Sequence, residues 1–279
     1  MPDEGLSLFA MKLRRFFMKR LCPRGIRRHI PRGIASQSFP GVIGRIHALD
    51  EMMTRVTPWG LDRYRATGRS AFENCEASLA AAGRSFSDVR TCLDLPCGYG
   101  RVLRLLQHRI GPAGVTACEL DPGAVDFCRR EFGVQGLLSA DDPDRLAFPD
   151  AYDLIWVGSL FTHLDPGRCA ALLRRLGAAL RTGGVLVFTT HGESCFARPG
   201  LPFYGRMFSA IGERMTAEFK RDGHCYSPYY ATGYYGISLH SEEFVRKLVR
   251  ESVAEPMQPV RFQPRGWDDH QDVWAYRKA

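Results

Sequence analysis

Apolar and polar positions follow two alternating periods along most of the chain, and these periods predict strands and helices in turn. Predicted strands cover residues 90–95, 114–119, 134–138, 152–157 and 185–190, and predicted helices cover 100–110, 122–131 and 166–181. Short apolar strands that alternate with amphipathic helices are typical of a parallel sheet. The pattern therefore predicts an α/β fold from about residue 89 onward.

The pattern changes after residue 190. Residues 191–236 contain ten Phe and Tyr residues with scattered Gly and Pro, and they show no sustained period. A helix is predicted from Ser241 to about Ser252, and two strands follow at about 259–263 and 271–277. A short turn joins these last strands, which favours an antiparallel pair. Because long loops inside a domain are usually functional, we expect 191–236 to shape a substrate pocket or lid. The alternative is that the aromatic residues of 191–236 form only a small hydrophobic cluster, separate from the main core.

The chain upstream of residue 89 divides into two predicted parts. Residues 1–33 form a basic amphipathic or disordered extension, and residues 34–88 form an N-terminal helical cap. Within the cap, Ser70 and Glu73 have the spacing of a capping box, which predicts a helix from Ser70 to about Ala82. Residues 89–279 are then the core, with the aromatic-rich insertion at about 191–236.

The net charge of +8 is concentrated in the extension. Residues 1–32 hold nine Lys and Arg against two Asp and Glu, a balance of +7, which leaves +1 for the rest. A basic tail of this kind does not indicate a nucleic-acid-binding face of the core, so nucleic acid is an unlikely partner. Residues 6–28 fit either a weak peripheral contact with the inner membrane or a loosely packed extension.

Composition places the chain among ordinary globular proteins, with 45% hydrophobic and 24% charged residues. No apolar run approaches the roughly 20 residues of a transmembrane helix. Nine cysteines without a Cys-x-x-Cys pair or zinc spacing favour a reduced, cytoplasmic protein with no metal site. The 33 arginines against 5 lysines are associated with a GC-rich bacterial genome. The oligomeric state is left open.

The strongest local motif is Asp94-Leu-Pro-Cys-Gly98-Tyr-Gly100, which follows an apolar run and precedes a helical pattern. A strand, glycine turn and helix in this order let a backbone approach a nucleoside-bearing ligand. A dinucleotide fingerprint would have a third glycine where Leu103 stands. Pro96 fixes its own φ and removes one N–H donor from the turn. A glycine turn without a ligand is the alternative.

This Asp-x-x-x-Gly-x-Gly spacing resembles the first motif of class I S-adenosylmethionine (SAM)-dependent methyltransferases. Residues 152–164 resemble the fourth-motif region of that superfamily, and 180–187 resemble its Leu-x-x-Gly-Gly turn. The ending, 266–274, is similar to bacterial small-molecule or polysaccharide-associated members. The resemblance implies a three-layer αβα Rossmann-like fold. Its seven-stranded mixed sheet would have the order 3-2-1-4-5-7-6, with strand seven antiparallel.

The resemblance also implies SAM as the cofactor and a set of cofactor-binding residues near the strand ends. A carboxylate at Glu119 suits both ribose hydroxyls, and Asp141 lies where the superfamily commonly has an acid for the adenine amino group. The run Asp141-Asp-Pro-Asp is also typical of a solvated turn. The full set of expected cofactor-binding residues is Asp94, Pro96, Gly98, Gly100, Glu119, Leu120, Asp141 and Ser159.

Two histidines follow predicted strand ends and are candidate catalytic bases, His163 and His191. Histidine suits proton removal because its pKa lies near the operating pH, although a packing role is the alternative. No Asn/Asp-Pro-Pro-Tyr run follows strand four, which disfavours methylation of an adenine amino group. We therefore expect methyl transfer to a small molecule or glycan, at oxygen rather than nitrogen. A non-catalytic binding module and an NAD-dependent oxidoreductase are the alternatives.

Overall fold

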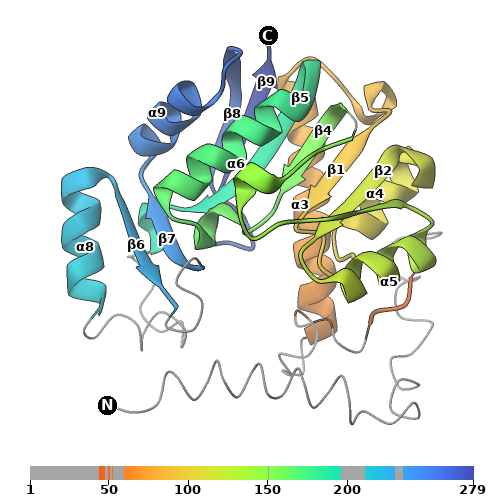
Figure 1. The fold of residues 1–279 in the computed structure, drawn as a ribbon, viewed down its shortest axis with the longest axis horizontal. Helices are drawn as coiled ribbons and strands as arrows, with labels where there is room; N and C mark the ends of the chain where they lie inside the picture. Colours follow the sequence, from red (N-terminus) through yellow and green to blue (C-terminus); the bar gives the residue numbers. More distant parts are fainter. Residues whose placement is uncertain are drawn as a thin grey trace.

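A computed structural model describes residues 44–47, 50, 52, 60–149, 151–195, 211–229 and 235–279. Its main sheet has seven strands in the order β3-β2-β1-β4-β5-β9-β8, and Figure 1 shows them side by side. Strands β1 to β5 run parallel, whereas β9 is antiparallel to both β5 and β8. The strands are Cys92–Leu95, Val115–Glu119, Gln135–Leu138, Tyr152–Val157 and Leu180–His191 for β1 to β5, then Met257–Trp267 and Gln271–Lys278 for β8 and β9. The sheet order predicted from the resemblance, and its antiparallel last strand, are confirmed.

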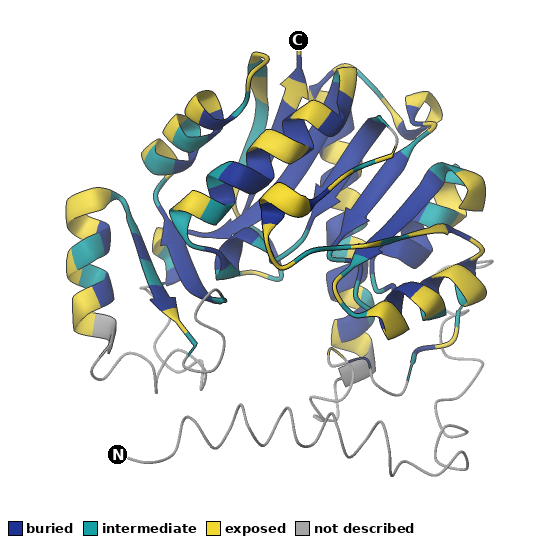
Figure 2. Cartoon of the chain, in the orientation of Figure 1, coloured by how far each residue is buried: buried dark blue, intermediate teal, exposed yellow. Residues whose placement is uncertain are grey.

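Helices cover both faces of this sheet and complete three layers. Helices α3 (Gly60–Ala81), α4 (Leu103–Ile110) and α5 (Pro122–Phe132) contribute to one hydrophobic core. Helices α6 (Pro166–Ala179) and α9 (Glu242–Ser252) contribute to the core on the opposite face. Figure 2 shows the buried strands between helices whose outer sides are exposed.

Strands β1, β2 and β4 form where the sequence predicts them because both of their faces are buried and mainly apolar. In β4, Leu154 and Trp156 enter one core, and Ile155 and Val157 enter the other. Successive side chains of a strand point to opposite faces, so a continuous apolar run serves a sheet that is covered on both sides. The predicted and observed bounds of β4 coincide.

The insertion between β5 and α9 shows no sustained period in the sequence, yet its described part has regular structure. It contains α8 (Ile211–Asp222) and two antiparallel strands, β6 (His224–Pro228) and β7 (Gly236–His240). These elements lie beside the main sheet, at the left of Figure 1. They share a small core of Cys195, Met215, Phe219, Cys225, Ile237 and Leu239. A satellite hydrophobic cluster therefore exists, and it supports a strand pair at the carboxyl end of β5.

The helix predicted to begin at Ser70 begins ten residues earlier, at Gly60. Ser70 lies inside α3, where its hydroxyl contacts the carbonyl of Gly266 at 3.5 Å instead of capping a helix. Asn74 donates to the same carbonyl at 2.8 Å. Contacts with the β8–β9 hairpin therefore outweigh the local capping signal.

The predictions for the extension and for part of the N-terminal cap concern residues that the structure does not describe. The extension 1–33 lies wholly outside the described residues, as does most of 34–59. Among the described residues, no helix has the length and hydropathy needed to cross a membrane. The described part of the chain also contains no group of three acidic, His or Cys side chains that could hold a metal ion.

Candidate functional site

The glycine turn between β1 and α4 presents bare backbone at the carboxyl edge of the sheet. Gly98 has φ +52° and Gly100 has φ +87°, values that L side chains rarely adopt. A Cβ placed on Gly98 would meet no atom within 4 Å, whereas one on Gly100 would collide with the Phe132 ring. Gly98 therefore faces open space that a ligand can approach, and Gly100 allows α5 to pack against the turn. The Leu95–Pro96 peptide that leads into the turn is cis.

Glu119 ends β2 and lies directly against this turn. One carboxylate oxygen accepts from Gly98 N at 2.8 Å, and the other accepts from Leu120 N at 2.7 Å. Burial raises the pKa of Glu119, and these backbone hydrogen bonds oppose that rise. The next side chain, Leu120, is 49% exposed despite being apolar. The structure thus brings together three predicted cofactor residues from β2 and the turn after β1.

Asp94 lies beneath the same turn and is 1% exposed. Its Oδ2 has no hydrogen-bond partner among the described residues. Burial raises the pKa of Asp94 well above its usual range, and the neighbouring Glu119 charge raises it further. Buried polar atoms almost always have partners, so an orphaned carboxyl oxygen marks a place where a ligand can supply one.

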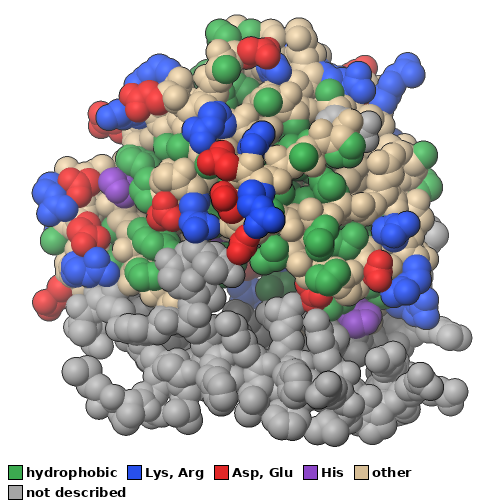
Figure 3. All heavy atoms as spheres, in the orientation of Figure 1, with side chains coloured by type: hydrophobic (Ala, Val, Ile, Leu, Met, Phe, Trp, Pro, Cys, Tyr) green, Lys and Arg blue, Asp and Glu red, His purple; other side chains and the backbone are tan. Residues whose placement is uncertain are grey.

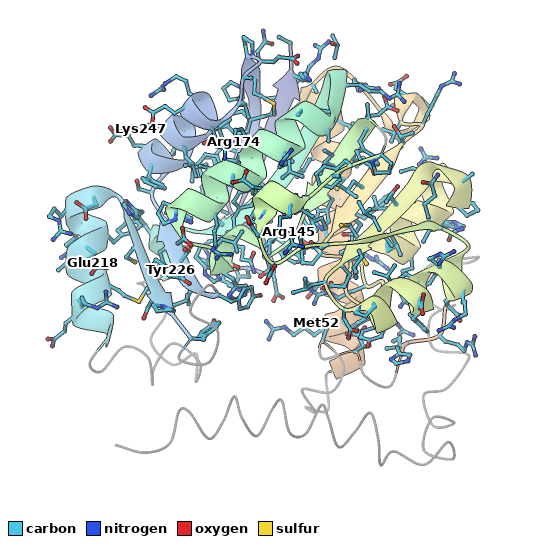
Figure 4. The ribbon with its side chains drawn as sticks, viewed as in Figure 1. Met52, Arg145, Arg174, Glu218, Tyr226 and Lys247 are labelled. Carbon is cyan, nitrogen blue, oxygen red and sulfur yellow. The ribbon has the colours of Figure 1, made fainter. Side chains whose placement is uncertain are left out.

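Asp141 lies in an exposed turn after β3. Its carboxylate accepts from Asp142 N at 2.9 Å, and its backbone carbonyl accepts from Arg168 at 2.9 Å. Its neighbour Asp142 caps a short 3-10 helix by accepting from Asp144 N. These bonds are those of a solvated turn, so the adenine role stays a prediction. Figure 4 labels Arg174 on α6, and Figure 3 shows acidic and basic side chains side by side in this region.

Ser159 follows β4 and has φ +57°. Its N–H donates to Thr189 Oγ1 at 2.8 Å, and its hydroxyl accepts from Gln271 Nε2 at 3.0 Å. Thr189 in turn donates to Gln271 Oε1 at 2.6 Å. Ser159 is therefore held at the end of β4 by residues from β5 and from β9, which the sequence motifs did not identify.

His163 joins the end of β4 to the insertion. Its Nδ1 lies 2.7 Å from the carbonyl of Gly236, so Nδ1 carries the hydrogen and Nε2 carries the ring lone pair. Its ring stacks on Tyr235 with centroids 4.6 Å apart, and Tyr229 OH lies 3.4 Å from Nδ1. The ring is half-buried. The strand pair β6–β7, on which Figure 4 labels Tyr226, thus forms one wall beside His163.

His191 ends β5 and is only 4% exposed. Its Nδ1 lies 3.3 Å from the carbonyl of Ser238 in β7. Burial lowers the pKa of His191 well below its usual value, and the nearby His163 and His270 lower it further. Burial therefore favours the neutral form of His191. Both predicted histidines contact the insertion, but His163 is the more accessible of the two.

The structure adds a contact from the N-terminal cap that the sequence did not predict. His47 stacks on Tyr99 of the glycine turn, with ring centroids 4.4 Å apart and planes 2° from parallel. Tyr99 OH also lies 3.3 Å from Asp121 Oδ2. The described part of the cap therefore packs on the glycine turn.

The glycine turn and the two carboxylates next to it fit a ligand that carries a nucleoside and a further polar group. Gly98 offers an open backbone surface, Glu119 offers a carboxylate for hydroxyl groups, and Asp94 offers an unpaired buried acceptor. Ligands of doubly wound sheets bind at the carboxyl ends of the strands, near the point where the strand order reverses. Here β1 lies between β2 and β4 at that point. The fold is that of class I SAM-dependent methyltransferases, and the open turn lies where this fold binds its ligands.

Comparison with known families gives the same class from the sequence. Residues 92–184 match the family described as "Methyltransferase domain". This range runs from β1 to the middle of β5 and includes the glycine turn and Glu119. This part of the chain is therefore a class I methyltransferase domain, a class whose methyl donor is SAM.

Several curated relatives match part of the chain. A malonyl-[acyl-carrier protein] O-methyltransferase of Acetivibrio thermocellus is 27% identical over 106 residues, 38% of this chain and 37% of the relative. A fatty-acid O-methyltransferase of Mycolicibacterium smegmatis is 29% identical over 112 residues, 39% of this chain and 40% of the relative. A probable phthiotriol/phenolphthiotriol dimycocerosates methyltransferase 2 of Mycobacterium ulcerans is 30% identical over 120 residues, 42% of this chain and 46% of the relative. The similarity spans less than half of each of these relatives.

Solved structures agree on the fold. Human N-acetylserotonin methyltransferase in complex with SAM aligns with a TM-score of 0.51 and 15% identity, covering 79% of this chain and 52% of that one. The PH0226 protein of Pyrococcus horikoshii OT3 aligns with a TM-score of 0.51 and 14% identity, covering 81% and 97%. At such identities the likeness shows the fold alone.

Proposed function

We propose that this methyltransferase transfers the methyl group of SAM to an oxygen of a small molecule or glycan. Three named relatives support the small-molecule class, since they are called methyltransferases of a malonyl carrier protein, a fatty acid and a complex lipid. The similarity to them covers less than half of this chain, so the acceptor has to be argued from this chain's own residues.

On the cofactor side, we propose that the glycine turn and Glu119 hold the nucleoside. Backbone at Gly98 borders open space, and the Glu119 carboxylate is already oriented by two backbone donors. Exposed Leu120 offers an apolar surface for the adenine ring beside it. The remaining members of the proposed set are Asp94, Pro96, Gly100, Asp141 and Ser159.

On the acceptor side, we propose that the insertion forms one wall of the pocket. Strand β7 contributes the carbonyls of Gly236 and Ser238 to His163 and His191. Tyr229 and Tyr235 approach the His163 ring from the same insertion. An acceptor bound between this wall and the end of β4 would lie next to the proposed position of the methyl group.

The orientation of His163 is the observation that carries the proposal for oxygen. Because Nδ1 donates to Gly236, the neutral ring presents its lone pair at Nε2. SAM supplies an electrophilic methyl on a sulfonium. A hydroxyl that attacks this methyl would form the new C–O bond as the methyl–sulfur bond breaks and S-adenosylhomocysteine leaves, and Nε2 of His163 would accept the hydroxyl proton. The proton and the positive charge then reside on the imidazolium. His191 is the second candidate base, but its burial disfavours the charged form.

A histidine base at His163 also favours one class of methyl acceptor over another. A carboxylate is ionised at neutral pH and needs no proton removal before it attacks. A histidine base is useful when the acceptor is an alcohol or phenol, whose proton must leave during transfer. We therefore propose a hydroxyl acceptor, with a carboxylic acid, such as the fatty acid for which one relative is named, as the competing outcome.

The test measures S-adenosylhomocysteine (SAH) formation from SAM with a panel of phenols, sugars, hydroxy acids and fatty acids. Hydroxyl acceptors should be turned over, and His163→Asn should lower kcat by ~10²–10⁴ while SAH affinity stays within twofold. His108→Asn, on α4, is the matched control and should keep wild-type turnover. Turnover restricted to carboxylic acids, with an active His163→Asn variant, would contradict the hydroxyl proposal.

A further inference from the structure

The proposed cofactor geometry divides the site into a nucleoside end and an amino-acid end. Glu119 lies at the end of β2, on one side of β1, and Ser159 follows β4 on the other side. If the ribose lies at Glu119, the methionine part of SAM extends across β1 toward β4. Its charged carboxylate must then find a cation near the ends of β1 and β4.

Arg101 occupies this position. It follows Gly100 in the glycine turn, and its guanidinium lies 5.5 Å over the ring of Trp267. The same ring lies against the end of β4, since a Cβ on Gly158 would be 3.1 Å from it. Trp267 is fixed there because its Nε1 donates to Thr67 O of α3 at 2.9 Å. The guanidinium is therefore between α3, the glycine turn and the end of β4.

The donors of Arg101 are not used by its acidic neighbours. Within the described residues, no hydrogen bond or ion pair reaches this guanidinium, although Asp50, Asp94 and Asp268 are close enough to influence its pKa. Asp268 instead accepts from Arg63 at 2.8 Å and from Thr67 at 3.0 Å. Burial lowers the pKa of Arg101, so its positive charge is poorly solvated and an anionic partner would stabilise it.

Asp50 and Asp94 are also consistent with a ligand at this point. Asp50 accepts from Tyr64 OH at 2.9 Å and from Met52 N at 3.0 Å, so its carboxylate is engaged elsewhere. Asp94 is fully buried and keeps Oδ2 without a partner in the described part of the chain. A guanidinium without a hydrogen-bond partner among the described residues lies near an unpaired carboxyl oxygen, and together they complement a ligand that carries both a carboxylate and an ammonium group.

We propose that Arg101 binds the α-carboxylate of the methionine part of SAM. Guanidinium groups match carboxylates with two parallel charge-assisted hydrogen bonds, which gives orientation as well as affinity. Arg101 would then fix the amino-acid end while Glu119 fixes the nucleoside end. This inference rests on the proposed cofactor site and adds a residue to it that no motif identified.

The test compares two ligands that differ only at the amino-acid end. SAH carries the carboxylate, whereas 5′-methylthioadenosine lacks the whole amino-acid part but keeps the nucleoside and sulfur. Calorimetry would measure both ligands with the wild type, Arg101→Met and Arg101→Lys. Arg90→Met, an exposed arginine before β1, is the matched control.

Arg101→Met should weaken SAH binding about ten- to a hundredfold, the scale of lost hydrogen bonds to a charged group, and should change 5′-methylthioadenosine binding less than threefold. Arg101→Lys keeps the charge but loses the paired geometry, so it should fall between the wild type and Arg101→Met. If the Met variant does not fold, a selective loss of SAH affinity in the Lys variant is the required result.

Equal weakening of both ligands would assign Arg101 a structural role and overturn the inference, as would unchanged SAH affinity. A wild type that binds 5′-methylthioadenosine as tightly as SAH would also overturn it, because the carboxylate would then contribute nothing. A wild type that binds neither ligand would contradict the proposed function itself, which distinguishes the two failures.

Discussion

Replacement of Glu119 by glutamine tests the nucleoside end of the site with little change in shape. Two hydrogen bonds from ribose hydroxyls to a carboxylate would become weaker bonds to a neutral amide. Hydrogen bonds to charged groups contribute ~1.5–3 kcal/mol against ~0.5–1.5 kcal/mol for neutral ones. The amide would also turn an NH₂ toward Gly98 N or Leu120 N, both of which the carboxylate accepts from in the wild type.

We therefore expect Glu119→Gln to weaken SAH binding by ~1–3 kcal/mol, or about five- to 150-fold in Kd. Isothermal titration calorimetry measures this directly, with thermal unfolding as a check on the fold. Asp126→Asn removes an exposed carboxylate from α5 and should bind SAH like the wild type. A folded Glu119→Gln variant with wild-type affinity would remove Glu119 from the cofactor site and refute the reasoning.

Two further predictions concern stability and the N-terminal extension. Burial lowers the pKa of His240 from 6.5 to about 4, so its contribution to stability is complete above pH 6.5 and is lost as the pH falls toward 4. His240→Phe should therefore become more stable relative to the wild type by ~2 kcal/mol between pH 7.5 and 5 in urea unfolding, and parallel stability curves would contradict this. Deletion of residues 1–33 should leave SAH affinity unchanged but abolish any low-salt sedimentation with anionic vesicles. Retained sedimentation of the truncated protein would place membrane contact elsewhere.

The sequence predicted the sheet well because the relevant signals are local. The apolar runs of β1, β2 and β4 and the glycine spacing after β1 all lie within a few residues of the structure they specify. Burial on both faces of a parallel sheet imposes the same requirement along each strand. Strand order and the antiparallel β9 came from the family resemblance and agree with the structure.

The start of α3 could not be predicted from local signals. Ser70 carries a capping pattern, yet the helix continues through it because Ser70 and Asn74 contact Gly266, nearly 200 residues away. Strands β6 and β7 were missed for a related reason. Their small core depends on contacts with α8 and Cys195, and the spacing of apolar residues in the insertion does not predict these contacts.

The site divides in the same way. Glu119 and the glycines could be predicted from their spacing along the sequence, and the structure brings them together. No motif assigned a role to Arg101 or Gln271. Their contacts at the site depend on the β8–β9 hairpin, which meets the ends of β1 and β4. His163 was found by its position after β4, but the tautomer that favours a base is set by Gly236, 73 residues further along.

The central claim is that the carboxyl edge of this sheet binds SAM through a nucleoside-specific site. The most direct measurement is calorimetric titration of the wild-type protein with SAH and, separately, with NAD⁺. The account predicts saturable binding of one SAH per chain, accompanied by a rise in thermal stability, and no binding of NAD⁺. Binding of NAD⁺ without SAH, or no binding of SAH by the folded protein, would contradict it.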